Sequence, residues 1–197
     1  LSYRRRDAPG VDALVIARSA DGVEFQATAE LVPARVGAAM TERAALLRLA
    51  ADHWRAYLSF ATPGSKHWWV DSLTAACPEE LPAGRRRLVL PGDDTVGVKD
   101  PVVRLTDGAW EMFLCCHPLS EPGHEERMTT RRLTRSDGLE WTDRGEVLRG
   151  TPGSWDERGA RLTAVLSVDP LTCLYDGRPD AESNWFETTG LADWRGD

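Results

Sequence analysis

The feature that most constrains this chain is an internal repeat of about 57 residues. The motif Trp54-x-x-Tyr57-Leu58 recurs as Trp110-x-x-Phe113-Leu114, 56 residues later. The segment RSADGVEF at 18–25 recurs as RSDGLEW at 135–141, and the two glycines are 116 residues apart, which is two steps of 58. A fixed period of this kind indicates a repeat architecture built from one supersecondary unit.

Each repeat reads as an acidic residue, an inner strand, an Asp-Gly-type turn, an aromatic strand, a strand ending in Ser-Asp-Gly, and an outer strand. Three or four short strands per repeat are typical of a β-propeller blade. The segment TERAALLRLAADHW at 41–54 has helical periodicity, but the repeat places it in strands. Because the first and last repeats are partial, the sequence predicts an all-β chain with about three and a half blades. We expect residues 1–197 to form a single propeller domain truncated at both ends.

The segment GVKDPVVRLTDGAWEMFLCC at 97–116 predicts two strands joined by an Asp107-Gly108 turn. Proline is tolerated at the first residue of a strand, so we expect the strand to begin at Pro101. Asp100 then lies just outside the sheet, where its carboxylate can face a ligand.

Two further acids occupy the equivalent position of their repeats. Glu42 precedes Asp100 by 58 residues, and Glu157 follows it by 57. In a propeller the leading ends of the inner strands converge on one central funnel, so the sequence predicts that these three carboxylates meet there. The alternative is that they are turn caps, which recur because the blade recurs.

At these residues the sequence resembles the five-bladed β-propeller glycosidases, which include arabinanases, xylosidases, fructosidases and mannoside phosphorylases. The shared features are the blade length, the Asp-Pro at an inner strand and the hairpin SDGLEW. The resemblance implies five blades, which would need about 290 residues at this period. This chain has 197 residues, so part of the ring would be missing.

The resemblance also implies roles for the acids, because glycosidic cleavage uses one carboxyl group as acid and another as base or nucleophile. Asp100 matches the orienting aspartate and Glu157 the general acid, with the adjacent Asp156 as the alternative acid. Glu42 matches the base, the nucleophile or a sugar-binding carboxylate.

Cations and aromatic residues near the acids are candidate substrate-binding residues. Lys99, Arg43 and Arg158 each adjoin a candidate acid, and they are either solvated charges or groups that balance the funnel or bind phosphate. Trp68, Trp69, Trp155 and Trp185 lie in or near loops, where they either stack on a sugar or pack in the core. Asp176 and Arg178, in YDGRPD, either bind sugar hydroxyls or belong to a plain turn.

Composition narrows the choice of function. With a net charge of −7, nucleic acid and anionic membranes are not expected partners. No metal-binding or cofactor motif is present, so we expect no metal and no cofactor. Cys115 and Cys116 read as buried free thiols, which favours a reducing compartment, and we expect a cytoplasmic location.

The predicted function is a glycosidase-like, carbohydrate-active protein. A glycoside phosphorylase and a non-catalytic glycan-binding propeller are the alternatives. Open blade edges are liable to aggregate, so we expect either disordered or absent residues in the parent protein or a second chain, such as another copy of this one, that covers the edges.

Overall fold

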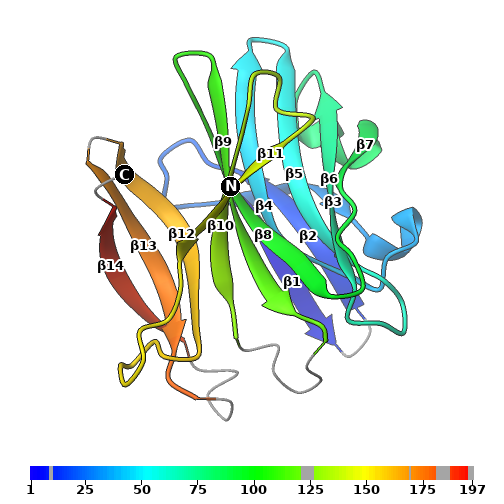
Figure 1. Ribbon diagram of the computed structural model, residues 1–197. Helices are drawn as coiled ribbons and strands as arrows, with labels where there is room; N and C mark the ends of the chain where they lie inside the picture. The colour runs from blue at the N-terminus through cyan, green and yellow to red at the C-terminus, as the bar shows by residue number, and fades with distance from the viewer. Residues whose placement is uncertain (9–10, 121–126, 169, 181–186, 195–197) are drawn as a thin grey trace. The chain divides into compact units, whose positions relative to one another are not determined.

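The computed structural model describes residues 1–8, 11–120, 127–168, 170–180 and 187–194. Within them the chain is all-β, with four antiparallel sheets and two short 3-10 helices (Figure 1). It divides into two compact units, residues 1–92 with 99–103 and residues 93–98 with 104–197. No helix in the described ranges has the length and apolar character needed to cross a membrane.

The first unit contains a three-stranded and a four-stranded sheet. The three-stranded sheet has the order β1-β2-β3, formed by Ser2–Ala8, Val11–Arg18 and Gln26–Leu31. The four-stranded sheet has the order β4-β5-β6-β7, formed by Met40–Ala50, His53–Ala61, Trp68–Ala75 and Arg85–Leu90. The 3-10 helices η1 and η2 are Pro33–Val36 and Pro78–Ala83.

The second unit repeats this pattern in the opposite order. Its four-stranded sheet has the order β8-β9-β10-β11, formed by Val96–Thr106, Ala109–Pro118, Thr129–Arg135 and Thr142–Leu148. Residues 99–103 of β8 group with the first unit. The three-stranded sheet has the order β12-β13-β14, formed by Gly159–Val168, Leu171–Arg178 and Thr188–Trp194.

The strands confirm the main elements read from the repeat. Residues 41–54 form β4, a turn and β5 rather than a helix. At the predicted Asp-Gly turn, Asp107 and Gly108 have φ of 50° and 77°. Two successive positive φ values are the type I′ geometry that fits the twist of a β-hairpin. The strands β1 and β7, both rich in arginine, were not predicted.

The repeated Asp-Gly segments at 21–22 and 137–138 form the same turn in both units. Asp21 Oδ1 accepts hydrogen bonds from the backbone N–H groups two and three residues later, each at 2.9 Å. Asp137 Oδ1 accepts from the equivalent groups at 2.9 and 3.3 Å. These bonds stabilise the ionised carboxylates, lowering the pKa of Asp21 to about 2 and also lowering the pKa of Asp137. Gly22 and Gly138 follow with φ of 78° and 68°.

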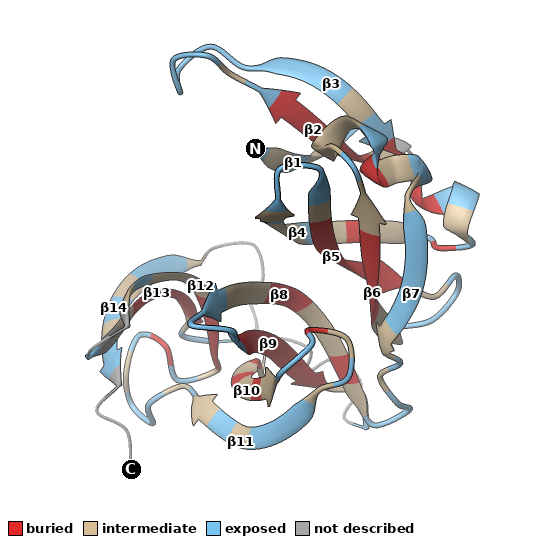
Figure 2. Cartoon of the chain, turned by 90° about the horizontal axis from the view of Figure 1, so that it is seen from above, coloured by how far each residue is buried: buried red, intermediate tan, exposed pale blue. Residues whose placement is uncertain are grey.

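Each unit has its own apolar core, and Figure 2 shows buried residues along β2, β5 and β6 of the first unit and along β9 of the second. In the first unit the core cluster comprises Leu14, Ile16, Leu31, Ala38, Ala56, Leu58, Phe60, Leu73 and Leu81. In the second unit the buried apolar residues include Met112, Phe113, Leu114, Met128, Leu133, Ala160 and Leu162. The aromatic-Leu motif that revealed the repeat therefore lies in the core of both units.

One polar side chain joins the two sheets of the second unit. The buried Thr130 hydroxyl donates to the carbonyl of Ala160 at 3.1 Å and accepts from the N–H of Leu162 at 3.0 Å. Both groups belong to β12, whereas Thr130 lies in β10. The buried hydroxyl thus both donates and accepts a hydrogen bond, which fixes β12 against its neighbouring sheet.

Candidate functional site

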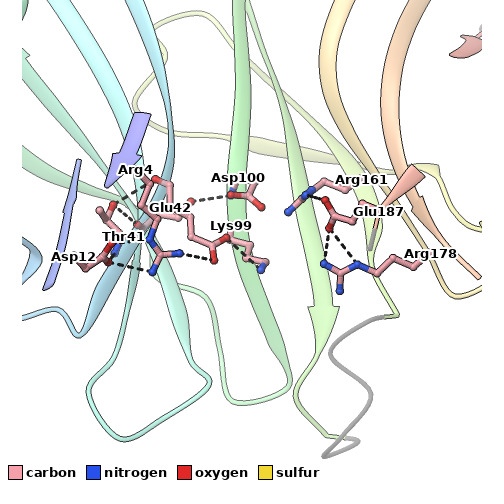
Figure 3. A network of polar contacts seen from close by, with 10 residues as sticks. Arg4, Asp12, Thr41, Glu42, Lys99, Asp100, Arg161, Arg178 and Glu187 are labelled. Atoms are coloured by element: carbon pink, nitrogen blue, oxygen red, sulfur yellow. Dashed lines mark hydrogen bonds and ion pairs between the residues drawn. The ribbon is translucent and has the colours of Figure 1, made fainter. Parts of the chain in front are cut away.

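Glu42 is the centre of a polar cluster in the first unit (Figure 3). It is the third residue of β4, and its side chain is half-buried. Its Oε1 accepts from Arg4 Nη1 at 3.2 Å, and its Oε2 accepts from Lys99 Nζ at 3.3 Å. The carboxylate is therefore held between two cations that come from β1 and β8. The sequence predicted Lys99 in the site, but it gave no sign of Arg4.

Arg4 is itself fixed by Asp12. Its Nε and Nη2 donate to Asp12 Oδ1 and Oδ2 at 2.7 and 3.2 Å, which is the two-point geometry that a guanidinium makes with a carboxylate. Asp12 Oδ2 also accepts from the backbone N–H of Thr41 at 2.9 Å. Asp12 thus orients Arg4 and anchors the start of β4. Neither residue recurs in the repeat, so the repeat could not identify them.

Lys99 lies over the ring of Trp68, with Nζ 5.4 Å from the ring centre. The Trp68 side chain is buried. A cation over the face of a tryptophan is attracted by the ring quadrupole, so Trp68 supports the ammonium that Glu42 binds. Trp68 is therefore a neighbour of Lys99. Direct stacking of Trp68 on a sugar stays a prediction.

Asp100 does not lie outside the sheet. The strand β8 begins at Val96, so Asp100 is inside it and Pro101 is not its first residue. Asp100 has φ of 52°, a left-handed conformation that Asp and Asn tolerate better than other non-glycine residues. Its N–H donates to Ser59 Oγ at 2.8 Å, and the residue is 1% exposed. The prediction that the strand starts at Pro101 was wrong, because a single left-handed residue interrupts the extended backbone without ending the pairing.

Asp156 lies in the second unit, in the turn before β12, and is buried. Its Oδ1 accepts from the N–H of Thr151 at 3.2 Å, and its Oδ2 accepts from the hydroxyl of Tyr175 at 3.0 Å. Burial of the phenol, together with this hydrogen bond, raises the pKa of Tyr175 to about 12. The structure therefore couples Asp156 to a neutral tyrosine that donates to it.

Glu157, the predicted general acid, is exposed, and its Oε2 accepts from the N–H of Gly153 at 2.9 Å. It lies two residues before β12 begins. This contact belongs to the second unit, whereas Glu42 and Asp100 belong to the first. Convergence of all three acids on one funnel stays a prediction.

Trp155 packs against the sheet of β13 and β14. Its ring stacks on Tyr175 with centroids 5.4 Å apart and an interplanar angle of 27°. A Cβ at Gly177 would come within 2.4 Å of the ring, and one at Gly190 within 2.7 Å. These glycines therefore make the space that Trp155 occupies. Trp155 still has 39% of its surface exposed, so part of it is accessible to a ligand.

Asp176 and Arg178 belong to a network of arginines and carboxylates in the second unit. Figure 3 labels Arg161, Arg178 and Glu187 of this network. Asp176 accepts from Arg161 Nη2 at 3.1 Å and from Thr189 Oγ1 at 3.0 Å. Glu187 accepts from both Arg161 and Arg178. Asp176 lies opposite Arg161 on one side and Thr189 on the other, so the network crosses β12, β13 and β14. Arg161 and Glu187 were not predicted from the sequence.

The remaining residues that the sequence predicted lie as follows. Arg43 is exposed and Arg158 is half-buried. Trp69 packs on Phe60 with ring centroids 5.7 Å apart. Trp185 lies outside the described residues.

Among the residues that the structure describes, no three His, Cys, Asp or Glu side chains are grouped to hold a metal ion. The predicted free thiols Cys115 and Cys116 are both buried and unbridged.

No protein-family model and no curated protein sequence matches this chain. Solved structures do match it in three dimensions. They include the beta-1,2-mannobiose phosphorylase from Listeria innocua, with a TM-score of 0.66, 15% identity and coverage of 92% of this chain and 49% of that one. A thermostable family-43 glycoside hydrolase has a TM-score of 0.72 and 13% identity, covering 100% and 67%. The GH32 beta-fructofuranosidase from Bombyx mori has a TM-score of 0.59 and 13% identity, covering 98% and 45%.

At these identities the likeness shows the fold alone. It confirms the predicted resemblance to the propeller glycosidases and the predicted all-β propeller fold. This chain spans about half to two thirds of the length of the three structures. The number of blades in a complete ring and the closure of that ring stay predictions.

Proposed function

We propose that this chain supplies part of the sugar-binding and hydrolytic site of a glycoside hydrolase. The observation that carries the proposal is the cluster in which Glu42 is held between Arg4 and Lys99. Lys99 directly precedes Asp100 in the sequence. It lies on a fold shared with glycoside hydrolases, and it brings β1, β4 and the middle of β8 together in one unit.

The geometry suits a carboxylate that acts in its ionised form. Two cations 3.2 and 3.3 Å away stabilise negative charge on Glu42. An ionised carboxylate is what glycosidic cleavage requires of the base or nucleophile. Asp100 is fixed by a hydrogen bond through its backbone and by a backbone conformation that few residues adopt. Sparsely populated conformations cluster at functional sites, which favours a positioning role for its carboxyl group.

Phosphorolysis is the second candidate. One of the similar structures is a mannobiose phosphorylase, and Arg4 and Lys99 are cations of the kind that bind phosphate. In that case inorganic phosphate, rather than water, would attack the sugar. A non-catalytic glycan-binding role would use the same polar groups without turnover.

The test is a turnover screen of the chain, and of any longer protein that contains it, on aryl glycosides and oligosaccharides with and without phosphate. Glu42→Gln should abolish most of the turnover while the fold is retained, and Asp52→Asn, at an exposed carboxylate in the turn after β4, is the matched control. Turnover that requires phosphate would select the phosphorylase. Sugar binding without turnover would overturn both catalytic proposals.

A further inference from the structure

A groove of about 580 Å³ lies on the four-stranded sheet of the second unit. It is bounded by the Asp107-Gly108 turn at the start of β9 and by the hairpin between β10 and β11. It contains none of the residues of the Glu42 cluster. The groove is lined by Asp107, Gly108, Ala109, Trp110, Glu111, Arg132, Thr134, Arg135, Ser136, Thr142 and Arg144.

Glu111, one of the lining residues, accepts hydrogen bonds from two arginines. Arg132 Nε donates to its Oε1 at 2.7 Å, and Arg104 donates to its Oε2. The Glu111 residue is 7% exposed. One buried carboxylate therefore fixes two guanidinium groups.

Arg144 adds a cation that lacks an acidic partner. Its Nε donates to Thr134 Oγ1 at 2.7 Å, and among the described residues it pairs with no carboxylate. The third lining arginine, Arg135, binds the exposed Glu140 at 2.9 Å. The other acid in the lining, Asp107, belongs to the turn. Arg144 is thus oriented by a neutral acceptor, with its charge available to a ligand.

The backbone at Arg144 is also irregular. Leu133 faces Asp143 and Arg131 faces Glu146, so β11 has one residue more than β10 over this interval. The extra residue forms a bulge, in which Gly145 has φ of 96° and donates its N–H to Asp143 Oδ1 at 2.7 Å. Bulges re-aim side chains and are frequent at sheet edges and beside functional sites. Figure 2 shows that β11 is largely exposed, so this edge is accessible within its unit.

The first unit contains an equivalent groove that lacks counterparts of Arg132 and Arg144. It lies at the matching Ser-Asp-Gly hairpin, measures about 610 Å³, and is lined by Arg18, Ser19, Ala20, Glu24, Phe25, Gln26 and Thr28. Its single arginine lies 3.7 Å from Glu79. The repeat therefore accounts for the groove and for Arg135, whose counterpart is Arg18, but it does not account for Arg132 and Arg144, which line only one of the two grooves.

We propose that the groove of the second unit binds a carboxylate-bearing sugar, a uronic acid unit of a glycan chain, as a site separate from the catalytic one. The planar fork of Arg144 matches a carboxylate at two points. The hydroxyls of Thr134, Ser136 and Thr142 and the fixed Arg132 provide partners for sugar hydroxyls. The sugar part of this inference rests on the proposed carbohydrate function, whereas the recognition of the carboxylate rests on the groove alone.

The test is calorimetric titration of the chain with tetragalacturonic acid, with maltotetraose as the neutral probe and sodium sulfate as the bare anion. Arg144→Ala should weaken binding of the acidic tetrasaccharide by roughly tenfold or more, and Arg144→Lys should restore only part of it because the fork is lost. Arg18→Ala, at the equivalent hairpin, should leave the affinity unchanged. Equal binding of maltotetraose would overturn the recognition of the carboxylate. Full displacement by sulfate at the concentration of the sugar would overturn the recognition of the sugar.

A separate variant distinguishes this inference from the catalytic proposal. Glu42→Gln should leave binding of tetragalacturonic acid in the groove unchanged, and Arg144→Ala should leave turnover of a neutral aryl glycoside unchanged. If no substrate is turned over but the acidic sugar binds through Arg144, the proposed hydrolysis fails and the groove site stands. If Glu42→Gln abolishes the binding, the acidic sugar occupies the Glu42 cluster and the groove site is overturned.

Discussion

The ammonium of Lys99 lies 3.3 Å from the carboxylate of Glu42, and both residues belong to the first unit. Both side chains are half-buried, and Arg4 holds the other oxygen of the carboxylate. The residues come from β4 and β8, 57 positions apart in sequence, so only the fold brings them together.

Replacing Lys99 tests whether this contact serves function or stability. Lys99→Met keeps a long apolar side chain against Trp68 and removes the charge. We expect the free energy of unfolding to change by no more than about 1 kcal/mol, because partly exposed ion pairs contribute little. Sugar affinity and turnover should fall by roughly tenfold or more. Urea unfolding and steady-state kinetics measure the two effects, and Lys66→Met, at the other lysine of the chain, is the control. Unchanged kinetics in Lys99→Met would exclude Lys99 from the site.

Asp100 allows a test that separates backbone strain from chemistry. Asn tolerates the left-handed conformation that Asp100 adopts, whereas Ala does not. We therefore expect Asp100→Ala to be about 1–2 kcal/mol less stable than Asp100→Asn in urea unfolding. Both variants should lose turnover, because both lack the carboxyl group. If Asp100→Asn keeps full activity, the residue is conformational and not catalytic.

The hydrogen bond from Tyr175 to Asp156 predicts a dependence of stability on alkaline pH. The pKa of Tyr175 is raised to about 12, against about 10 for an ordinary tyrosine. The neutral phenol is favoured in the folded state, so its stabilisation is complete below pH 10. It is lost between pH 10 and 12, where the unfolded phenol ionises first.

The variant Tyr175→Phe isolates this contribution. It removes the hydroxyl donor of the buried Asp156, so the free energy of unfolding should fall by roughly 1–3 kcal/mol at pH 8. The difference between the two proteins should shrink as the pH rises from 10 to 12. Urea unfolding at several pH values measures it. A difference that stays constant to pH 12 would show that the hydroxyl is not the titrating group.

Sequence reasoning found the blade repeat because apolar and turn residues recur at fixed spacing. The strands β5 and β9, the two Ser-Asp-Gly turns and the Asp107-Gly108 turn all follow from local patterns that the structure confirms. Local patterns did not reveal Arg4 and Asp12, because their contacts with Glu42 and Thr41 span 38 and 29 residues. Strand β1 was missed for a related reason, since its run of arginines has no apolar alternation.

The candidate site was predictable only where it follows the repeat. Glu42 and Asp100 were found because they occupy equivalent positions, but the left-handed backbone at Asp100 has no signature except the identity of the residue itself. The network of Arg161 and Glu187 was not predicted, because it depends on the pairing of β12 with β13 and because Glu187 lies outside the strands. Pairing register is a tertiary property that composition does not reveal.

The predicted role of Glu157 as general acid can be tested by comparing turnover of substrates whose leaving groups differ. If Glu157 donates the proton, Glu157→Gln should lower turnover of substrates with poor leaving groups by roughly 10²–10⁴-fold. Turnover of an aryl glycoside with an acidic phenol should fall far less, because that group leaves without protonation. The glutamine oxygen can still accept from the N–H of Gly153, so the turn and the stability should be preserved.

The adjacent Asp156 is the matched alternative for that role. It is buried and accepts hydrogen bonds from Tyr175 and Thr151, so Asp156→Asn should lower the stability of the fold. It should also lower turnover if Asp156 is the proton donor. If Asp156→Asn abolishes turnover on poor leaving groups and Glu157→Gln has no effect, the acid is one residue earlier than the repeat predicts. If neither variant changes any rate while the fold is retained, both carboxylates act as turn caps, since Glu157 accepts from Gly153 and Asp156 from Thr151. The proton donor would then have to come from another residue.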